Sequence, residues 1–509
     1  MDSRLIRAAK DSARPSSGSR RPPVGIFIAG LTMLVAAEVG IVLVALAELR
    51  VHEAGVVTVC LLGLAMQVAA WSQRLLVLIA AIVYIGVLGW AYSGLISDTY
   101  AYQGMVNQNP GATDVLVTAT LAWLPAVWLP LGRPRPSVVI LWTLYLLAYV
   151  PSTLIPLYVS GSLSEILPFL VTIAGSMVLI AWMTQLHLPP VGGFELTRVR
   201  FSLLITMLAL VSLAYVALSF GVSFTIPNLE DVYETRSEFR SAVGSGVLLS
   251  VGGYLIPWAG NAINPILLSI GLMQRRAGLI MIALAGQLLI YSVTGFKSVL
   301  FTVALVPLVY VVVAVAPRWF AILSTAGMSI VVGLALLATS TLASPWPVAL
   351  VTRLLATPGQ LTAHYVEYFS THPHFALSHS VLRGIVPTPY GEDAPFIIGA
   401  AYFSPGTNAN GGIWADAFAN FGLAGVLGFT ILLGLGLLVL DAIAHGRDPR
   451  LIAPMLAIAG LSLANAGLLT TIMTLGLGLG TVLITLTPQA NRVSMAAASE
   501  APVERQPEE

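Results

Sequence analysis

Residues 343–412 read ASPWPVALVTRLLATPGQLTAHYVEYFSTHPHFALSHSVLRGIVPTPYGEDAPFIIGAAYFSPGTNANGG. This is the one long piece between predicted membrane spans that is not itself a span. Four of the chain's seven histidines lie in it, and so do several charged residues: His364, His372, His374, His379, Arg353, Arg383, Glu367, Glu392 and Asp393. Because the rest of the chain is mostly apolar, this density of titratable groups marks the segment as the place where chemistry could occur.

The composition around this segment indicates a polytopic membrane protein of the all-α class. The 509 residues are 57% hydrophobic and 9% charged, with a mean hydropathy of +0.88, whereas soluble domains contain about 25% charged residues. A membrane helix needs about 20 apolar residues. That length predicts about fourteen spans, near residues 24–47, 55–72, 75–96, 113–132, 137–158, 166–186, 201–224, 245–272, 277–294, 298–316, 318–342, 414–440, 450–468 and 470–487.

The distribution of Lys and Arg predicts the orientation, because cytoplasmic loops are enriched in these residues. With both termini inside, the outer side carries only six of the 24 cations: Arg50, Arg236, Arg240, Lys297, Arg353 and Arg383. The long segment 343–412 is therefore expected outside. The transmembrane domain is expected over 24–487, with outer loops 225–244 and 343–412 forming the site, and 1–23 and 488–509 as disordered cytoplasmic tails.

Several classes of protein are excluded or disfavoured by the sequence. The net charge of +1 and the scattered Arg give no indication of a nucleic-acid partner, and a single Cys60 excludes a disulfide framework or a Cys-based metal site. Lys297 lies in TGFKS, which lacks the spacing of a nucleotide-binding loop. An ATP-driven pump or a sugar-nucleotide transferase is therefore not expected.

Two features inside the predicted spans have two interpretations each. Glu38 lies in the middle of the first span, where a carboxylate is either functional or protonated and bonded to a neighbouring helix. The eighth span contains Gly252, Gly253, Pro257 and Asn261 among other helix-breaking residues. It is either a kinked structural helix or the wall of a cavity.

The outer loop before the eighth span predicts an amphipathic helix. At 100° per residue, Glu230, Glu234 and Glu238 fall on one face, while Arg236 and Arg240 fall on the apolar face. These two Arg either extend to lipid headgroups or bind a lipid-borne phosphate, for which a guanidinium fork is suited.

The long segment itself predicts short helices that begin at Pro347 and Pro358. The second would present Leu361, Tyr365, Tyr368 and Phe369 on one face and Gln360, His364 and Glu367 on the other, as an amphipathic helix lying at the interface. Pro373 interrupts the His cluster, so a general base is favoured over a metal site. Aromatic residues could stack on sugars, and short polar residues could cap the next helix or bind sugar: Tyr365, Tyr368, Tyr390, Tyr402, Trp414, Asn408, Asn410, Asp416 and Asn420.

Five stretches together resemble the oligosaccharide repeat-unit polymerases, the O-antigen polymerases of the Wzy type. They are YETRSEFR (233–240), TGFKSVLF (294–301), HPHFALSHS (372–380), PYGEDAPFIIGAAYF (389–403) and NANGGIWADAFANFGLAGV (408–426). The resemblance covers roughly residues 225–440, and NANGGIWADAFANFG is its most specific part. It implies a membrane-embedded type-C glycosyltransferase fold in the bacterial inner membrane, in which a glycan is transferred from undecaprenyl diphosphate to another lipid-linked repeat unit without metal or cofactor.

The resemblance also implies roles for residues, and it implies a chain-length regulator and a flippase as partners. The expected catalytic residues are Arg236, Arg240, Arg353, His364 and His379. The expected substrate-binding residues are Lys297, Arg383, Tyr365, Tyr402, Asn410 and Asp416. Which His acts as the base stays open at this point. The alternatives are an O-antigen ligase and a lipid-linked oligosaccharide flippase, although a transporter should place its charges along a path through the spans rather than on one side.

Overall fold

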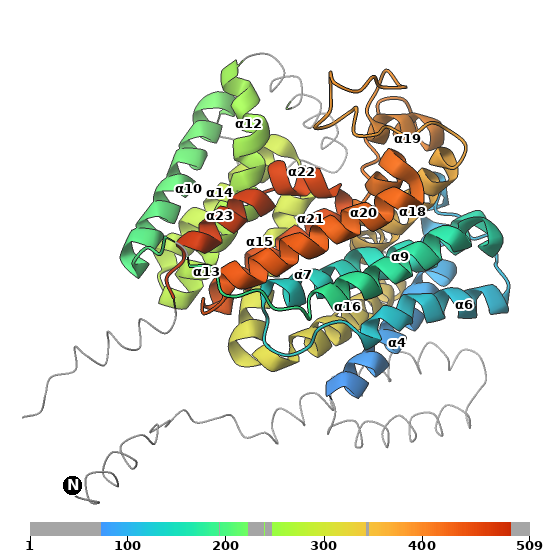
Figure 1. The fold of residues 1–509 in the computed structure, drawn as a ribbon, viewed down its shortest axis with the longest axis horizontal. Helices are drawn as coiled ribbons and strands as arrows, with labels where there is room; N and C mark the ends of the chain where they lie inside the picture. The colour runs from blue at the N-terminus through green and yellow to red at the C-terminus, as the bar shows by residue number, and fades with distance from the viewer. Residues whose placement is uncertain (1–72, 193, 222–238, 240–246, 343–345, 490–509) are drawn as a thin grey trace, which may run out of the picture. The chain divides into compact units, whose positions relative to one another are not determined.

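The computed structural model describes residues 73–192, 194–221, 239, 247–342 and 346–489. Within these ranges every regular element is a helix, joined by loops and two isolated β-bridges, which confirms the all-α class (Figure 1). The α-helices are α4 (Gln73–Ala91), α5 (Ser97–Thr99), α6 (Ala112–Trp123), α7 (Pro136–Leu144), α8 (Val150–Ser160), α9 (Leu163–Met183), α10 (Arg198–Phe220), α12 (Val247–Trp258), α13 (Asn264–Gln274), α14 (Ala277–Thr294), α15 (Lys297–Val315), α16 (Phe320–Leu342), α17 (Trp346–Val351), α18 (Thr357–Phe369), α19 (Ala394–Tyr402), α20 (Ile413–Ala444), α21 (Pro449–Asn465), α22 (Leu468–Met473) and α23 (Leu477–Leu486).

Nine helices in the described part of the chain are long and apolar enough to cross a membrane, which fits a multi-pass membrane protein. They are Gln73–Thr99, Pro136–Ser160, Leu163–Met183, Arg198–Phe220, Ser250–Gln274, Ala277–Thr294, Ser298–Val315, Pro317–Leu342 and Ile413–Ala444. Each coincides with a predicted span. Several predicted features lie outside the described residues. They are the spans 24–47 and 55–72 with Glu38 and Cys60, the tail 1–23, and residues 490–509 of the second tail.

Three further predicted spans differ from the expectation. The apolar helices Ala112–Val127 and Pro449–Asn465 are shorter than a full span, and the last predicted span, 470–487, is broken into α22 and α23. The turn between them ends at Gly476, which precedes α23 and has a left-handed φ of +93° that glycine adopts readily. Apolar content alone therefore overestimated the length of continuous helix in these regions.

The eighth predicted span is helical over its described residues and contains one π-helical turn. A π-helical turn, η5 (Ala259–Ile263), joins α12 to α13, and such a turn leaves backbone carbonyls without their usual partners. The Gln287 side chain of α14 donates from Nε2 to the Gly260 carbonyl at 2.9 Å, and Asn264 donates to Gln287 Oε1 at 3.3 Å. Side chains of the protein therefore provide partners for these polar groups at the π-helical turn.

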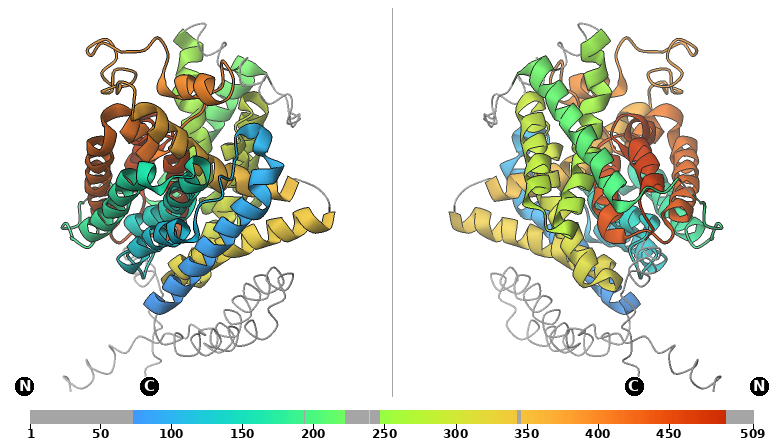
Figure 2. Two further views of the ribbon diagram at one scale, coloured as in Figure 1. Left: turned by 90° about the vertical axis from the view of Figure 1, so that its right-hand side faces the viewer. Right: turned by 90° about the vertical axis from the view of Figure 1, so that its left-hand side faces the viewer.

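Helix packing brings the long segment into contact with the spans. Figure 2 shows α4 (blue) and α16 (yellow) close together at one end, and these two helices contact each other. Helix α20 packs on α9, and α21 packs on α7 and α15. Helices α17 and α18 are joined by the π-helical turn η7 (Thr352–Ala356), and α18 packs against both α8 and α20.

The prediction that α18 is an amphipathic helix lying at the interface is wrong. The helix does begin next to Pro358, as expected. Two of the three residues of its expected polar face are buried, Gln360 at 1% and His364 at 8% exposed, whereas Glu367 is exposed. The Gln360 amide donates to the Gln103 carbonyl at 2.8 Å, so a partner inside the protein replaces water. A Cβ at Gly359 would lie 2.5 Å from the Pro151 carbonyl oxygen, which shows how closely α18 approaches α8.

Candidate functional site

Helix α20 is interrupted near its start, and this interruption positions the site. Phe421 and Gly422 have non-helical backbone angles, and Gly422 lies at φ +60° and ψ −146°. The preceding carbonyls are bonded by the loop that follows α18: Phe375 N donates to Ala419 O, and Ala376 N donates to Asn420 O, both at 3.0 Å. A broken helix at membrane depth requires such protein partners for its free backbone groups.

The Asn420 side chain holds this loop on α20. Its Oδ1 accepts from Leu377 N at 2.8 Å, and its Nδ2 donates to the Asp416 carbonyl at 2.9 Å. Asn420 is 1% exposed. The sequence suggested a cap or a sugar ligand for this residue, whereas the structure shows that it fixes the loop bearing His379 beside the first turns of α20.

His379 and Asp416 meet as a result of this docking. His379 Nε2 lies 4.0 Å from Asp416 Oδ1, and the two side chains are 12% and 24% exposed. His379 Nδ1 is buried and has no hydrogen-bond partner among the described residues, and the same holds for the hydroxyl of the adjacent Ser378. Two buried polar atoms that lack partners are unusual in a folded protein.

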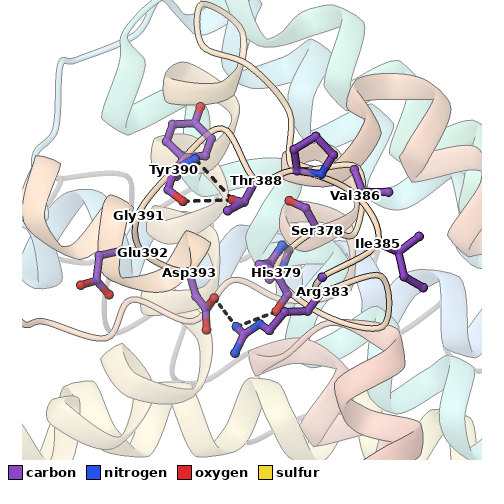
Figure 3. Close-up of a pocket in the computed structure, with 12 residues that line it drawn as sticks. Ser378, His379, Arg383, Ile385, Val386, Thr388, Tyr390, Gly391, Glu392 and Asp393 are labelled. Carbon is purple, nitrogen blue, oxygen red and sulfur yellow. Dashed lines mark hydrogen bonds and ion pairs between the residues drawn. The ribbon is translucent and has the colours of Figure 1, made fainter.

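A pocket of about 660 Å³ adjoins these residues (Figure 3). Arg383 Nη2 donates to Asp393 Oδ1 at 2.6 Å and to the His379 carbonyl at 2.9 Å. Asp393 thus neutralises Arg383, and Glu392 adds a negative charge. The pocket is lined by Ser378, His379, Arg383, Gly384, Ile385, Val386, Pro387, Thr388, Tyr390, Gly391, Glu392 and Asp393. This lining favours an uncharged polar ligand over an anion.

The environment of His379 favours its neutral form. Burial lowers the pKa of His379, the Asp393 carboxylate raises it and the Arg383 guanidinium lowers it, with a net decrease from its usual 6.5. At neutral pH the imidazole therefore has a free lone pair, and it can accept a proton as a general base.

His364 lies in a different environment. Its ring stacks on Tyr402 with ring centroids 4.1 Å apart, and Glu367 Oε2 is 3.8 Å from its Nδ1. Neither ring nitrogen has a hydrogen-bond partner among the described residues, and burial lowers the pKa of His364 to about 4. His364 is absent from the lining of the pocket, so the geometry supports a packing role for it rather than the expected catalytic role.

This burial predicts a pH-dependent stability. The pKa of His364 is about 4 in the folded state and about 6.5 in the unfolded state, so unfolding binds a proton between these values. Stability should fall as the pH drops from 6.5 toward 4, by on the order of 3 kcal/mol. We expect thermal unfolding in detergent to show a smaller loss between pH 7 and pH 5 for His364→Phe than for the parent. An unchanged loss would contradict this, and His372→Phe is the control.

The other two histidines of the cluster are exposed and held by their neighbours. His372 stacks on Tyr368 with ring centroids 4.0 Å apart, and its Nδ1 lies 2.9 Å from the Tyr368 carbonyl. The His374 ring packs edge-on against Phe418. In the part of the chain that the structure describes, no group of three His, Cys, Asp or Glu is placed to hold a metal ion.

The remaining predicted residues do not gather in this pocket. Tyr365 is 1% exposed and its hydroxyl donates to the Ala409 carbonyl at 3.0 Å, so it has no free ring face for a sugar. One face of Tyr402 is covered by His364. Arg353 and Asn410 are exposed on η7 and on the loop before α20, and Lys297 is the first residue of α15. Arg236 and Arg240 lie outside the described residues.

Of the predicted site residues, the structure thus brings together His379, Arg383 and Asp416. It adds Ser378, Glu392 and Asp393, none of which was among the predicted site residues. The sequence had marked Glu392 and Asp393 only as part of the cluster of titratable groups in residues 343–412, and Ser378 only by its position within the stretch HPHFALSHS. Comparison with models of known protein families finds no match for this chain, and no curated protein and no solved structure matches it.

Proposed function

We propose that this protein is a membrane glycosyltransferase of the extracytoplasmic side of the bacterial inner membrane, with both termini in the cytoplasm. It would transfer an oligosaccharide from an undecaprenyl diphosphate carrier to a lipid-linked repeat unit. The observation that carries the proposal is His379, an imidazole that lines a polar pocket and that burial keeps in its neutral form at pH 7. The resemblance of residues 225–440 to repeat-unit polymerases supplies the substrate class.

In the proposed reaction, this pocket supplies the base, and the cations that bind the diphosphate lie elsewhere. The acceptor hydroxyl oxygen bonds to the anomeric carbon of the donor, the bond from that carbon to the diphosphate oxygen breaks, and the diphosphate leaves with the electron pair. The hydroxyl proton passes to His379. Because Arg383 is paired with Asp393 and Glu392 is close by, the pocket suits the acceptor sugar and repels a diphosphate.

The diphosphate would be bound elsewhere on the outer side. The expected residues are Arg236 and Arg240, with Arg353 or Lys297, an expectation that rests on the sequence because the first two lie outside the described residues. Preorganised cations stabilise the charge that develops on a departing diphosphate. A chain-length regulator and a flippase remain the partners that this function implies.

A reconstituted assay tests the proposal. Purified full-length protein in liposomes, given a synthetic undecaprenyl diphosphate-linked repeat unit, should produce a ladder of longer lipid-linked glycans. The ladder should form without nucleotide and persist in EDTA, since the proposed chemistry uses side chains alone. The matched control is the same repeat unit on undecaprenyl monophosphate, a poorer leaving group.

Other outcomes of this assay would contradict the proposal. A single transfer to a different acceptor would indicate a ligase. Movement of the lipid-linked glycan across the bilayer without a new glycosidic bond would indicate a flippase. A requirement for one specific divalent ion would show that the expected metal-independent chemistry is wrong.

A further inference from the structure

Two consecutive residues of the loop after α18 have a strained backbone. Ala376 lies at φ +48° and Leu377 at φ +62°, in the left-handed region that residues other than glycine occupy at a cost. In the part of the chain that the structure describes, a positive φ at a residue other than glycine occurs elsewhere only at Asn109 and Arg275. Such a conformation persists only where the surrounding contacts hold it.

Helix α20 provides these contacts through three successive backbone N–H groups of the loop. Phe375 N donates to the Ala419 carbonyl and Ala376 N donates to the Asn420 carbonyl, both at 3.0 Å. Leu377 N donates to the side-chain Oδ1 of Asn420 at 2.8 Å. Only the third bond depends on the identity of a side chain, so Asn420 is the residue through which the sequence specifies this docking.

Leu377 links this docking to the turn that carries His379. The Leu377 carbonyl accepts from Ser380 N at 3.0 Å and from Leu382 N at 3.2 Å, and both bonds close turns that contain His379. The His379 ring also packs edge-on against Phe375, with ring centroids 4.4 Å apart. The turn is therefore built on the residue that Asn420 holds, and a shift of Leu377 displaces the imidazole.

We propose that Asn420 is a positioning residue for the transfer reaction: it holds the strained residues 376 and 377 on α20 and thereby fixes His379 at the pocket. Asn420 is 1% exposed and is not part of the pocket lining, so it acts through the loop and not on the substrate. A misplacement of about 1 Å can cost a factor of about 100 in rate. The catalytic consequence rests on the proposed function, whereas the anchoring of the loop does not.

Asn420→Ala tests the anchoring without relying on turnover. Hydrogen–deuterium exchange of the full-length protein in detergent, followed on peptides by mass spectrometry, reports how often the loop amides open. Without the Oδ1 acceptor the strain is no longer offset, so exchange over residues 375–382 should become about 10- to 100-fold faster. Peptides from α16, which packs on α4, should keep the parental exchange. Parental exchange in the loop would overturn the inference.

A glycine at the strained position should partly replace the lost bond. Glycine adopts φ +48° without strain, so adding Ala376→Gly to Asn420→Ala should slow the loop exchange again by about fivefold or more. The matched control is Ser380→Gly in the same background, which introduces a glycine into the same loop at a residue without a positive φ. It should bring no recovery. Equal recovery by the two glycines, or none by Ala376→Gly, would contradict the role of strain.

Turnover in the liposome assay provides the second readout. Asn420→Ala should reduce kcat by roughly 10- to 100-fold, and Ala376→Gly should restore part of this loss in the same background, in step with the loop exchange. A residue that only supports the fold would not have its kcat recovered by relief of strain in a loop. A kcat that does not follow the loop exchange would show that Asn420 does not position the base.

A variant on the loop guards against a folding defect in Asn420→Ala. A β-branched side chain is more strained than alanine at a positive φ, so Ala376→Val should speed the loop exchange and lower kcat while Asn420 is retained. Parental values of both would overturn the inference. If the parental protein shows no glycan transfer, the proposed function fails, while the exchange data still decide whether Asn420 anchors the loop.

Discussion

His379→Ala is expected to reduce the initial rate of glycan transfer by about 10²- to 10⁴-fold, the usual contribution of a positioned general base. The ring packs edge-on against Phe375 with ring centroids 4.4 Å apart, so the thermal unfolding of the variant in detergent is measured alongside its rate. The matched control is His372→Ala, which removes an exposed imidazole that is stacked on Tyr368. That control should transfer glycan at close to the parental rate.

The pH profile gives a sharper form of the same prediction. Only the neutral imidazole can accept a proton, so the parental rate should rise with pH through the pKa of His379, which burial keeps below its usual 6.5, and then level off. The residual activity of His379→Ala should lack this rise. An alanine variant that transfers at the parental rate, or that keeps the same acid limb, would show that another group is the base.

Gly422→Val should have the largest effect on folding of the substitutions considered in α20. The Gly422 backbone angles, φ +60° and ψ −146°, are favourable for glycine alone. A side chain there costs about 1–3 kcal/mol in backbone strain. An added Cβ would also lie 3.1 Å from His374 Nε2. The variant should lower the thermal unfolding temperature in detergent and displace the loop that carries His379, with loss of transfer.

The same helix provides a matched control for this substitution. Gly428 is exposed, has no neighbouring atom within 4 Å of an added Cβ and lies in regular helix. Gly428→Val should therefore stay close to the parent in both unfolding temperature and activity. Equal unfolding temperatures for the two valine variants would show that the interruption in α20 does not depend on glycine.

The all-helical class and the positions of most spans could be predicted from the sequence. An apolar run of about 20 residues in a lipid environment forms a helix, because the helix makes all of its backbone hydrogen bonds within the segment. This rule needs no knowledge of the neighbouring segments. The helix start next to Pro358 is similarly local. The rule failed to predict the break near Gly476, where a local turn divides an apolar run into α22 and α23.

The choice among the four histidines was decided only by the tertiary structure. Helical periodicity placed His364 on a polar face, but its ring is buried against Tyr402 and Phe403, which come from a later segment of the chain. His379 becomes the candidate base because Asn420 docks its loop on the interruption of α20, beside Asp416. Sequence patterns report the tendency of a segment to be buried or helical, whereas the pairing of an imidazole with a carboxylate depends on distances between segments that only packing sets.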